Sequence, residues 1–375
     1  MKYAFAIFKY FPFGGLQRDM LRMAEEAASR GHRVTVFTSR WDGPQPENLE
    51  VRIIPWRGLS NHSAAVKFAA RLKQELAAED FDRVVLFNRM DVPADFYFAA
   101  DDCQADVLAR RHCSLMLKLH PRYRTFLKQE KALFTAEDGP AVWYIAPQQK
   151  TAFRKCYGTP EERFRYLPPG MNPACRRPEE SKVREIREAK RRELGLAPDE
   201  IAVILVAAQF HLKGGDRLLQ GIAALPEELR RRIRLIWAGN GSDSLCRRMA
   251  RRLNLAEQVK VLGGRNDVPE LLLASDIMIH PARFESAGSV LIEAIAAGVP
   301  VIATAACGFA SFVAEIHEKL VLKEPFCQEE LNDAMVQALQ MLPELTEKTI
   351  AYASRTDFCS RAARAVDMLE EERKS

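Results

Sequence analysis

The strongest constraint on the fold is a repeated alternation of short apolar runs with amphipathic helical stretches. Runs at 3–8, 33–38, 83–87 and 143–146 have the length and composition of buried strands. After the first run, apolar residues recur at helical spacing: Leu16, Met20, Met23, Ala24 and Ala27. Strands that alternate with helices predict a parallel sheet covered by helices on both faces. We therefore expect a doubly wound α/β domain in the first half of the chain.

The alternation starts again after a break. The segment 167–175 (LPPGMNPAC) concentrates three prolines and a glycine, a composition that interrupts regular structure. A charged helix is expected at 182–194, and five strands at 201–208, 233–239, 259–264, 276–281 and 300–304. We predict an N-terminal domain at 1–167 and a C-terminal domain at 168–354. A last helix, at 355–373 within the remaining 355–375, is expected to pack back toward the first domain.

Composition narrows the class of protein. The chain has 375 residues, 47% apolar and 28% charged, which suits two globular domains. It holds no uncharged apolar stretch of about 18 residues, the length of a membrane span, and its first apolar run is too short for a signal peptide. The eight cysteines form no C-x-x-C pair, so neither a zinc cage nor a redox motif is indicated. We expect a cytoplasmic protein without a bound metal.

The loop after the first strand contains paired glycines, Gly14 and Gly15, directly before a helix. Glycines at a strand–helix turn let a ligand approach the backbone, and the helix start offers free N–H groups. The loop does not match the G-x-G-x-x-G fingerprint of dinucleotide-binding proteins. A tight turn without a ligand is the alternative interpretation.

A more specific signal lies at 285–293 (ESAGSVLIE), between a strand ending in His-Pro and a helix closed by Gly298. The small residues at 286–289 leave the amides of a helix N-terminus open to a phosphate. Glu285 and Glu293 can flank the same ligand and accept hydrogen bonds from its hydroxyls. An ordinary surface glutamate is the alternative for Glu293, although its apolar neighbours would make an unpartnered carboxylate costly to bury.

This spacing resembles the E-x7-E motif of retaining GT-B glycosyltransferases, glycosyltransferase family four. Three further segments are similar to that family: 9–19 (KYFPFGGLQRD), Lys213-Gly214, and 264–268 (GRNDV). The resemblance covers essentially the whole chain. It implies the GT-B architecture, two Rossmann-like domains facing across a cleft. Within the family it points to members that move glucose from UDP-glucose onto the inner-core heptose of lipopolysaccharide.

The resemblance also implies roles for individual residues. Glu285 is expected to hold hydroxyls of the donor sugar and Glu293 the nucleotide ribose. Lys213 would neutralise the leaving diphosphate, and Arg265 would lie near the base. The amides of the diphosphate site would come from Gly14, Gly15, Ala287, Gly288 and Ser289. Asp19 and Asp101 match acidic positions at the donor–acceptor junction; a helix surface residue and a helix N-cap are the respective alternatives.

One departure from the family concerns charge. Many members carry an arginine beside the matching lysine or at the start of its loop, where this chain has Leu212 and Ala208. Arg265, Arg283 and Arg217 are candidates to replace it, because a buried diphosphate needs compensating charge. The resemblance implies same-face attack, with no covalent nucleophile and no metal. Asp101 is the candidate base for the acceptor hydroxyl.

The stretch 103–134 combines basic and apolar residues. Its basic residues are Arg110, Arg111, Lys118, Arg122, Arg124, Lys128 and Lys131, and its acids are Asp106 and Glu130. Its apolar residues include Leu115, Met116, Leu117, Leu119, Tyr123, Phe126 and Leu127. We expect it to dock on an anionic membrane that carries a lipid-linked saccharide acceptor. A helical hairpin with its charges in water is the alternative.

Three other functions compete with a transferase. A nucleotide-sugar epimerase of the same fold would need no acceptor, and a non-catalytic nucleotide-sugar-binding protein would turn nothing over. A nucleic-acid-binding protein would rest only on the arginine clusters at 230–232 and 247–252. Those arginines alternate with apolar residues at helical spacing and indicate solvated helix faces, so we expect no nucleic-acid partner.

Overall fold

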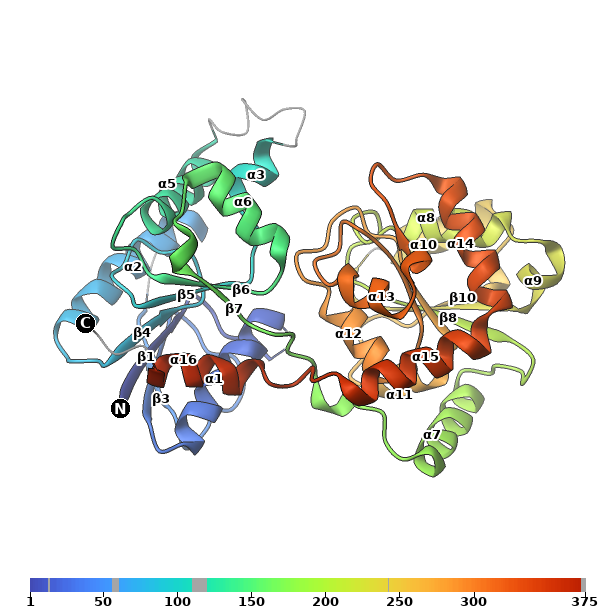
Figure 1. Ribbon diagram of the computed structural model, residues 1–375, viewed down its shortest axis with the longest axis horizontal. Coiled ribbons are helices and arrows are strands. Elements are labelled where there is room, and N and C mark those ends of the chain that lie inside the picture. The colour runs from blue at the N-terminus through green and yellow to red at the C-terminus, as the bar shows by residue number, and fades with distance from the viewer. Residues whose placement is uncertain (13, 56–60, 110–119, 242, 372–375) are drawn as a thin grey trace. The chain divides into compact units, whose positions relative to one another are not determined.

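The structure is a computed structural model that describes residues 1–12, 14–55, 61–109, 120–241 and 243–371. The chain forms two compact units (Figure 1). The first unit comprises Met1–Gly170 and Ser360–Ser375, and the second comprises Met171–Cys359. The unit boundaries therefore follow Gly170 and Cys359, where the sequence suggested 167 and 354.

The first unit is built on a seven-stranded parallel sheet in the order β3-β2-β1-β4-β5-β6-β7. The strands are β1 (Lys2–Ile7), β2 (Arg33–Thr38), β3 (Glu50–Ile53), β4 (Arg83–Leu86), β5 (Phe96–Ala99), β6 (Ala141–Tyr144) and β7 (Phe164–Tyr166). The helices are α1 (Gly15–Ser29), α2 (Asn61–Ala77), α3 (Gln104–Ala109), α5 (Pro121–Phe134), α6 (Pro147–Tyr157), the 3₁₀ turn η1 (Glu161–Arg163), and α16 (Arg361–Glu371).

Helices cover both faces of this sheet, as the alternation of residues along β1 shows. Ala4 and Ala6 share an apolar cluster with Phe68 of α2, Phe134 of α5 and Phe153 of α6. Tyr3 points to the opposite face, where its ring lies 4.8 Å from that of His32. Successive side chains of a strand point to opposite faces of a sheet, so a central strand needs apolar residues at every position.

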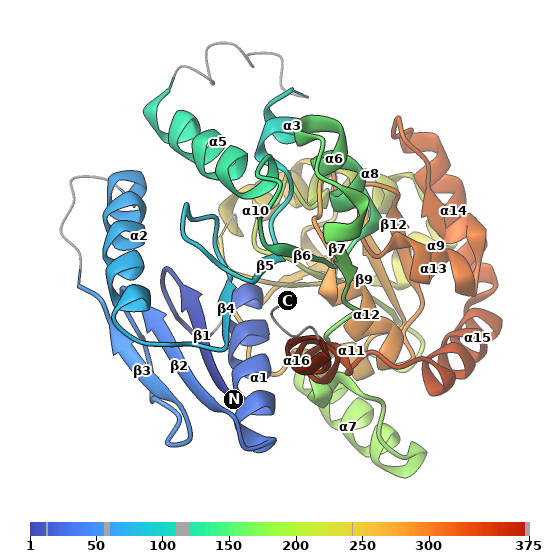
Figure 2. The same cartoon turned by 60° about the vertical axis from the view of Figure 1, so that its left-hand side comes forward.

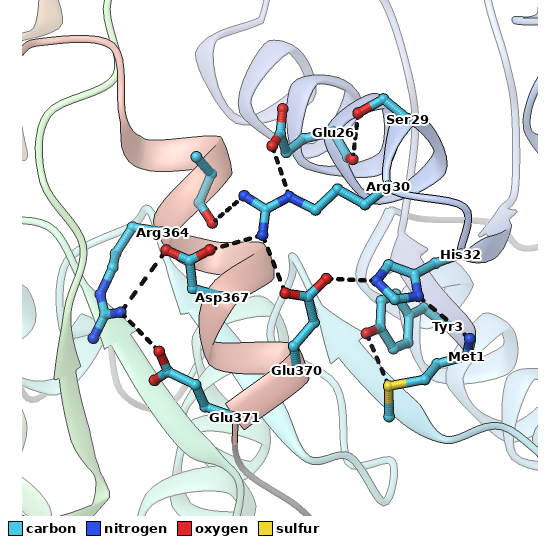
Figure 3. Close-up of polar contacts among 11 residues, drawn as sticks. Met1, Tyr3, Glu26, Ser29, Arg30, His32, Arg364, Asp367, Glu370 and Glu371 are labelled. Carbon is cyan, nitrogen blue, oxygen red and sulfur yellow. Dashed lines mark hydrogen bonds and ion pairs between the residues drawn. The ribbon is translucent and has the colours of Figure 1, made fainter.

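The C-terminal helix α16 lies beside α1 in the first unit (Figure 2). Arg30 contacts Asp367 at 2.7 Å and Glu370 at 3.1 Å, and His32 contacts Glu370 at 2.7 Å (Figure 3). The predicted helix 355–373 is therefore wrong at its start. A preceding helix, α15 (Leu342–Arg355), ends where the prediction began, and Phe358 in the connection is buried. The helical spacing of apolar residues continues across this connection, so the break between α15 and α16 could not be predicted from it.

The second unit contains a six-stranded parallel sheet in the order β10-β9-β8-β11-β12-β13. The strands are β8 (Ile201–Val206), β9 (Ile233–Ala238), β10 (Val259–Val261), β11 (Ile277–His280), β12 (Val301–Thr304) and β13 (Val321–Leu322). The α-helices are α7 (Glu180–Glu193), α8 (Gly215–Ala224), α9 (Glu227–Arg232), α10 (Asp243–Arg252), α11 (Val268–Ala274), α12 (Ser289–Ala296), α13 (Ala310–Ile316), α14 (Gln328–Gln340) and α15. Three 3₁₀ turns complete the unit: η2 (Pro173–Cys175), η3 (Ala256–Gln258) and η4 (Glu318–Leu320).

The nine predicted strand positions are occupied by strands, with ends that differ by up to a few residues. Four strands were missed: β3, β5, β7 and β13. β3 carries two charged residues and none of its side chains is buried, while β5, β7 and β13 have four, three and two residues. β3 lacks the apolar run that marks a buried strand, and β7 and β13 are too short to show one. β5 is apolar and buried throughout, and nothing in its composition explains why it was missed.

The two sheets repeat the strand order that places a topological switch point at their centre. In each, the first strand of the unit lies between the second and the fourth. Ligands bind such sheets in the crevice at the carboxyl ends of the strands on either side of the switch point. In the second unit these strands are β8 and β11, whose following loops carry Lys213 and Glu285. None of the described helices is both long enough and apolar enough to cross a membrane.

Candidate active site

The Lys213 loop is held against the end of β11 by a close backbone contact. Gly214 has a φ of +73°, a left-handed conformation that favours glycine. A Cβ atom at this position would stand 2.0 Å from the carbonyl oxygen of Pro281. Only glycine therefore lets the two loops after β8 and β11 approach so closely, and the residue beside it is Lys213.

The Glu285 segment is fixed by the loop after β12. The Glu285 amide donates to the Ala306 carbonyl at 3.4 Å, and the Glu285 carbonyl accepts from the Gly308 amide at 3.0 Å. The segment then turns into α12 through Gly288, whose φ is +87°. Hydrogen bonds on both sides of Glu285 fix its backbone, and with it the point from which the side chain extends.

The side chains of Lys213 and Glu285 meet. Lys213 Nζ lies 2.6 Å from Glu285 Oε2, and it also donates to the Phe284 carbonyl at 3.3 Å. The Nε2 atom of His280, the last residue of β11, lies 3.3 Å from the same carboxylate oxygen. Two residues proposed for different parts of a nucleotide sugar thus form one ion pair, with a buried histidine beside it.

The surroundings keep Glu285 ionised. Burial raises the pKa of this carboxyl, but the hydrogen bond from His280 and the charge of Lys213 lower it more, so the pKa falls below its usual value. The nearby Cys307 behaves in the opposite way, because burial raises the pKa of its thiol to about 12. A thiol with so high a pKa is a poor nucleophile at neutral pH.

Helix α12 supplies the second part of the site. Ala287, Gly288 and Ser289 lie at its start, and Gly288 caps the helix without a side-chain hydrogen bond. The first amides of a helix have no partner within it, so they can donate to an anion. Glu293 lies on the same helix with its side chain mostly buried. Glu285, Glu293 and the helix start thus belong to one continuous segment.

The three arginines that are candidates to replace the missing family arginine all have interaction partners. Arg265 contacts Asp267 and Glu193, at 2.7 Å and 3.2 Å respectively. Arg283 forms two parallel hydrogen bonds of 2.7 Å with Asp216. Arg217 donates to the Pro281 carbonyl at 3.1 Å and lies over the Phe326 ring. Arg217 and Arg283 stand beside the Pro281 and Lys213 loops, whereas Arg265 is tied to the end of α7.

In the first unit, Gly14 and Gly15 lie at the start of α1, as expected. Gly14 is the N-cap and Gly15 the first helical residue. A Cβ at Gly14 would collide with the side chains of Gln17 and Phe11, whereas nothing lies within 4 Å of a Cβ placed at Gly15. The backbone at Gly15 is therefore open to approach, and Gly14 is required for local packing.

The two aspartates of the first unit have different surroundings. Asp19, on α1, contacts Arg361 of α16 at 2.7 Å, and Arg361 is buried. Asp101 follows β5, is 62% exposed, and lies 3.6 Å from Arg89. The alternative interpretation of Asp101 as a helix N-cap is wrong for α3. The amides of Gln104 and Ala105, at the start of this helix, donate to Glu130 instead.

His280 is the residue of the site that sequence reasoning missed. A single histidine at the end of a strand carries no motif. Its position before Pro281, where a strand reaches the carboxyl edge of the sheet, was the available signal. Within the described residues, no group of three or more histidine, cysteine or acidic side chains could hold a metal ion.

The fold is that of a GT-B glycosyltransferase, and the chain belongs to that family. Residues 13–174 match the family described as Glycosyltransferase Family 4, and residues 186–356 match Glycosyl transferases group 1. The chain is 37% identical over 369 residues to the lipopolysaccharide glucosyltransferase WaaG of Escherichia coli (strain K12). The aligned region covers 98% of each chain.

Solved structures of glycosyltransferases have the same fold. The crystal structure of WaaG, described as a glycosyltransferase involved in lipopolysaccharide biosynthesis, matches with a TM-score of 0.90 and 36% identity, over 99% of this chain and 100% of that one. Anabaena HepE in complex with UDP and glucose matches with a TM-score of 0.73 over 99% of this chain and 100% of that one. Its identity is 18%, so this second likeness concerns the fold alone.

Proposed function

We propose that this glycosyltransferase moves glucose from UDP-glucose, with retention of configuration, onto the inner-core heptose of lipopolysaccharide. The observation that carries the proposal is the Lys213–Glu285 pair beside the start of α12, in a chain 37% identical to a lipopolysaccharide glucosyltransferase. Lys213 and the α12 amides offer positive charge to a diphosphate, and the two glutamates offer acceptors to hydroxyls.

The chemistry follows from the charge that develops as the sugar–phosphate bond breaks. Negative charge grows on the leaving diphosphate, where Lys213 and the amides of Ala287, Gly288 and Ser289 would stabilise it. Glu285 would hold the sugar hydroxyls and Glu293 the ribose. The departing phosphate would take the proton of the acceptor hydroxyl on the same face, and Asp101 is the candidate to assist.

The same arrangement supports transfer without a metal ion. A lysine and helix amides supply the charge stabilisation that a divalent cation provides in other glycosyltransferases. We expect full activity in the presence of EDTA. Complete loss of activity with EDTA, restored by magnesium or manganese, would contradict this part of the proposal.

A donor panel tests the function. Purified protein is incubated with UDP-glucose, UDP-galactose and GDP-mannose, each with heptose-terminated lipopolysaccharide, and the mass of the acceptor is measured. We expect the gain of one hexose, with UDP-glucose the best donor. Conversion of a nucleotide sugar in the absence of acceptor would favour the epimerase, and binding without turnover would favour the non-catalytic protein.

We further propose that the stretch 103–134 docks the enzyme peripherally on the anionic inner face of the cytoplasmic membrane. Residues 110–119 of this stretch lie outside the described residues. In the described part, both acids are buried, whereas the basic residues Arg122, Arg124, Lys128 and Lys131 are exposed. The exposed charge of α5 is therefore positive, and Phe126, which lies under Arg122, is partly exposed beside it.

Vesicle sedimentation tests the docking. Each basic residue near an anionic surface contributes about 1 kcal/mol, so four suffice for reversible binding that weakens as salt rises. The variant with Arg122, Arg124, Lys128 and Lys131 changed to Gln should lose most of its binding to anionic vesicles. The matched control changes four exposed arginines of α10, Arg247, Arg248, Arg251 and Arg252, to Gln and should bind normally. Equal loss in both variants, or equal binding to neutral vesicles, would contradict the proposal.

A further inference from the structure

His280 is a buried polar side chain with one polar contact. Its side chain is 1% exposed, and its Nε2 atom lies 3.3 Å from Glu285 Oε2. Its Nδ1 atom is buried and has no hydrogen-bond partner among the described residues. Burying an imidazole with one nitrogen unsatisfied is unfavourable, which indicates that the contact with Glu285 is the reason for this residue.

The direction of this hydrogen bond follows from chemistry. An ionised carboxylate can only accept, so Nε2 must carry the hydrogen and donate it to Glu285. The backbone of His280 is fixed by its place in the sheet, since it is the last residue of β11 and pairs in register with Ala303 of β12, and its ring is buried, with 1% of the side chain exposed. The next loop is tied as well, because the Thr304 hydroxyl donates to the Ala282 carbonyl at 2.6 Å. The histidine is therefore a rigid donor.

Lys213 is a different kind of partner. Its ammonium lies at the end of a long flexible side chain, and in the proposed function this ammonium neutralises the diphosphate. An ammonium shared between Glu285, 2.6 Å away in the free protein, and a diphosphate offers each of them less of its charge. When Lys213 turns to the diphosphate, Glu285 loses its nearest charge in a site where burial disfavours a carboxylate.

We propose that His280 is the positioning residue that holds Glu285 oriented and ionised while Lys213 serves the diphosphate. This inference rests on the proposed function and deepens its account of the donor site. The charged and titratable groups that face Glu285 are Lys213, His280 and Cys307. Of these, the Cys307 thiol stays protonated at neutral pH because burial raises its pKa to about 12. His280 is then the one donor to Glu285, among these groups, that does not move.

A matched pair of variants isolates the donor. Gln and Met have similar length and volume, and only Gln has an N–H that can replace Nε2–H. The hydrogen bond from His280 lowers the pKa of Glu285, so its removal raises that pKa and moves the acid limb of activity to higher pH. We expect His280→Met to lower kcat at least tenfold, a loss typical of a hydrogen bond to a charged group, with that shift of the acid limb. His280→Gln should restore most of the rate and the wild-type pH profile.

Binding of UDP-glucose to the protein without acceptor, measured by calorimetry from pH 4 to pH 7, separates this inference from the function. As the pH is lowered, His280→Met should lose its affinity for UDP-glucose at a higher pH than wild type does. His280→Gln should lose it at the same pH as wild type. If wild type binds in this way but transfers nothing, the function fails and the inference stands. His317→Met, a histidine of the same unit in a pocket beside Leu320 and Met341, is the control and should match wild type.

The wild-type protein gives an independent readout. Nitrogen-15 spectra of the His280 ring should show hydrogen on Nε2 both in the free protein and with UDP-glucose bound. A His280→Met variant that folds and keeps the wild-type pH profile would overturn the proposal, as would an Nε2 without hydrogen in the UDP-glucose complex.

Discussion

The ion pair between Lys213 and Glu285 joins two side chains that a bound nucleotide sugar would separate. Each is about 18% exposed, so the pair is accessible to a ligand while it excludes most water. Water exclusion strengthens the hydrogen bonds that the carboxylate can offer to hydroxyls. In the free protein Glu285 is thus kept ionised, with Lys213 beside it.

Removing either carboxylate charge should reduce transfer. We expect Glu285→Gln and Glu293→Gln each to lower kcat/KM at least tenfold, because a charge-assisted hydrogen bond is worth about 1.5–3 kcal/mol. The measurement is steady-state transfer, with thermal unfolding as the control for folding. Near-normal turnover in both variants would show that the site is elsewhere.

Gly214 offers a test of the backbone contact that places Lys213. Gly214→Ala puts a Cβ atom against the Pro281 carbonyl and forces alanine to a φ of +73°. Left-handed alanine alone costs about 1–2 kcal/mol, and the collision must add to this by moving one of the two loops. We expect a larger loss of unfolding free energy than in the control, together with a loss of transfer.

The control is Gly195→Ala, where φ is +60° and a Cβ would meet nothing within 4 Å. It carries the conformational cost alone. Equal losses of stability in the two variants, or normal transfer by Gly214→Ala, would contradict the role given to the Pro281 contact.

The residues of the site differ in how far the sequence could predict them. Glu285 and Glu293 lie in one segment, so their spacing could be compared with a family motif. Lys213 and Glu285 are 72 positions apart, and only the strand order brings them together. His280 could not be assigned, because a lone histidine has no spacing to interpret.

Among the strands, most buried ones could be predicted from the sequence, whereas the short buried strand β5 and the strands β3, β7 and β13 could not. β1 and β8 are continuous apolar runs, because both faces of a central parallel strand are covered. β3 has no buried side chain and β13 has two residues, so their existence depends on neighbouring strands rather than on their own composition. The last helix was predicted to begin at 355, whereas α16 begins at Arg361, because the helical spacing of apolar residues does not mark the break.

Helix α16 is held to α1 by the Arg361–Asp19 pair, and this contact predicts a stability effect. Arg361 is 3% exposed and also donates to the Pro168 carbonyl at 2.9 Å. Breaking a buried pair by removing one partner costs about 3 kcal/mol, because the other charge loses its compensation. We expect Arg361→Leu to lower the unfolding free energy of the protein by this amount in chemical denaturation.

Arg364→Leu, on the same helix, is the control. Arg364 is 44% exposed and its ion pairs, at 3.4 and 3.9 Å, belong to the surface, so its loss should cost less than about 1 kcal/mol. Adding Asp19→Asn to Arg361→Leu should recover part of the loss, as coupled partners do. A similar cost for Arg361→Leu and Arg364→Leu would show that the Asp19 pair has no special weight.

The molecule as a whole is proposed to transfer glucose from UDP-glucose to a heptose-terminated acceptor with retention of configuration. The two units contribute different residues to the proposed reaction. The second unit carries Lys213 and Glu285 of the proposed donor site, and the first carries Gly15, the first residue of α1, and Asp101, which follows β5. Retention requires that the new bond form on the face from which the diphosphate leaves.

The most direct measurement is the configuration of the transferred sugar. UDP-glucose labelled with carbon-13 in the sugar is incubated with the protein and heptose-terminated lipopolysaccharide, and the anomeric carbon of the product is observed by NMR. We predict that wild type forms an α-linked glucose and that Glu285→Gln forms at least tenfold less of this product, as expected for the loss of a charge-assisted hydrogen bond. A β-linked product, or an unchanged acceptor when the protein is folded and binds UDP-glucose, would contradict this prediction.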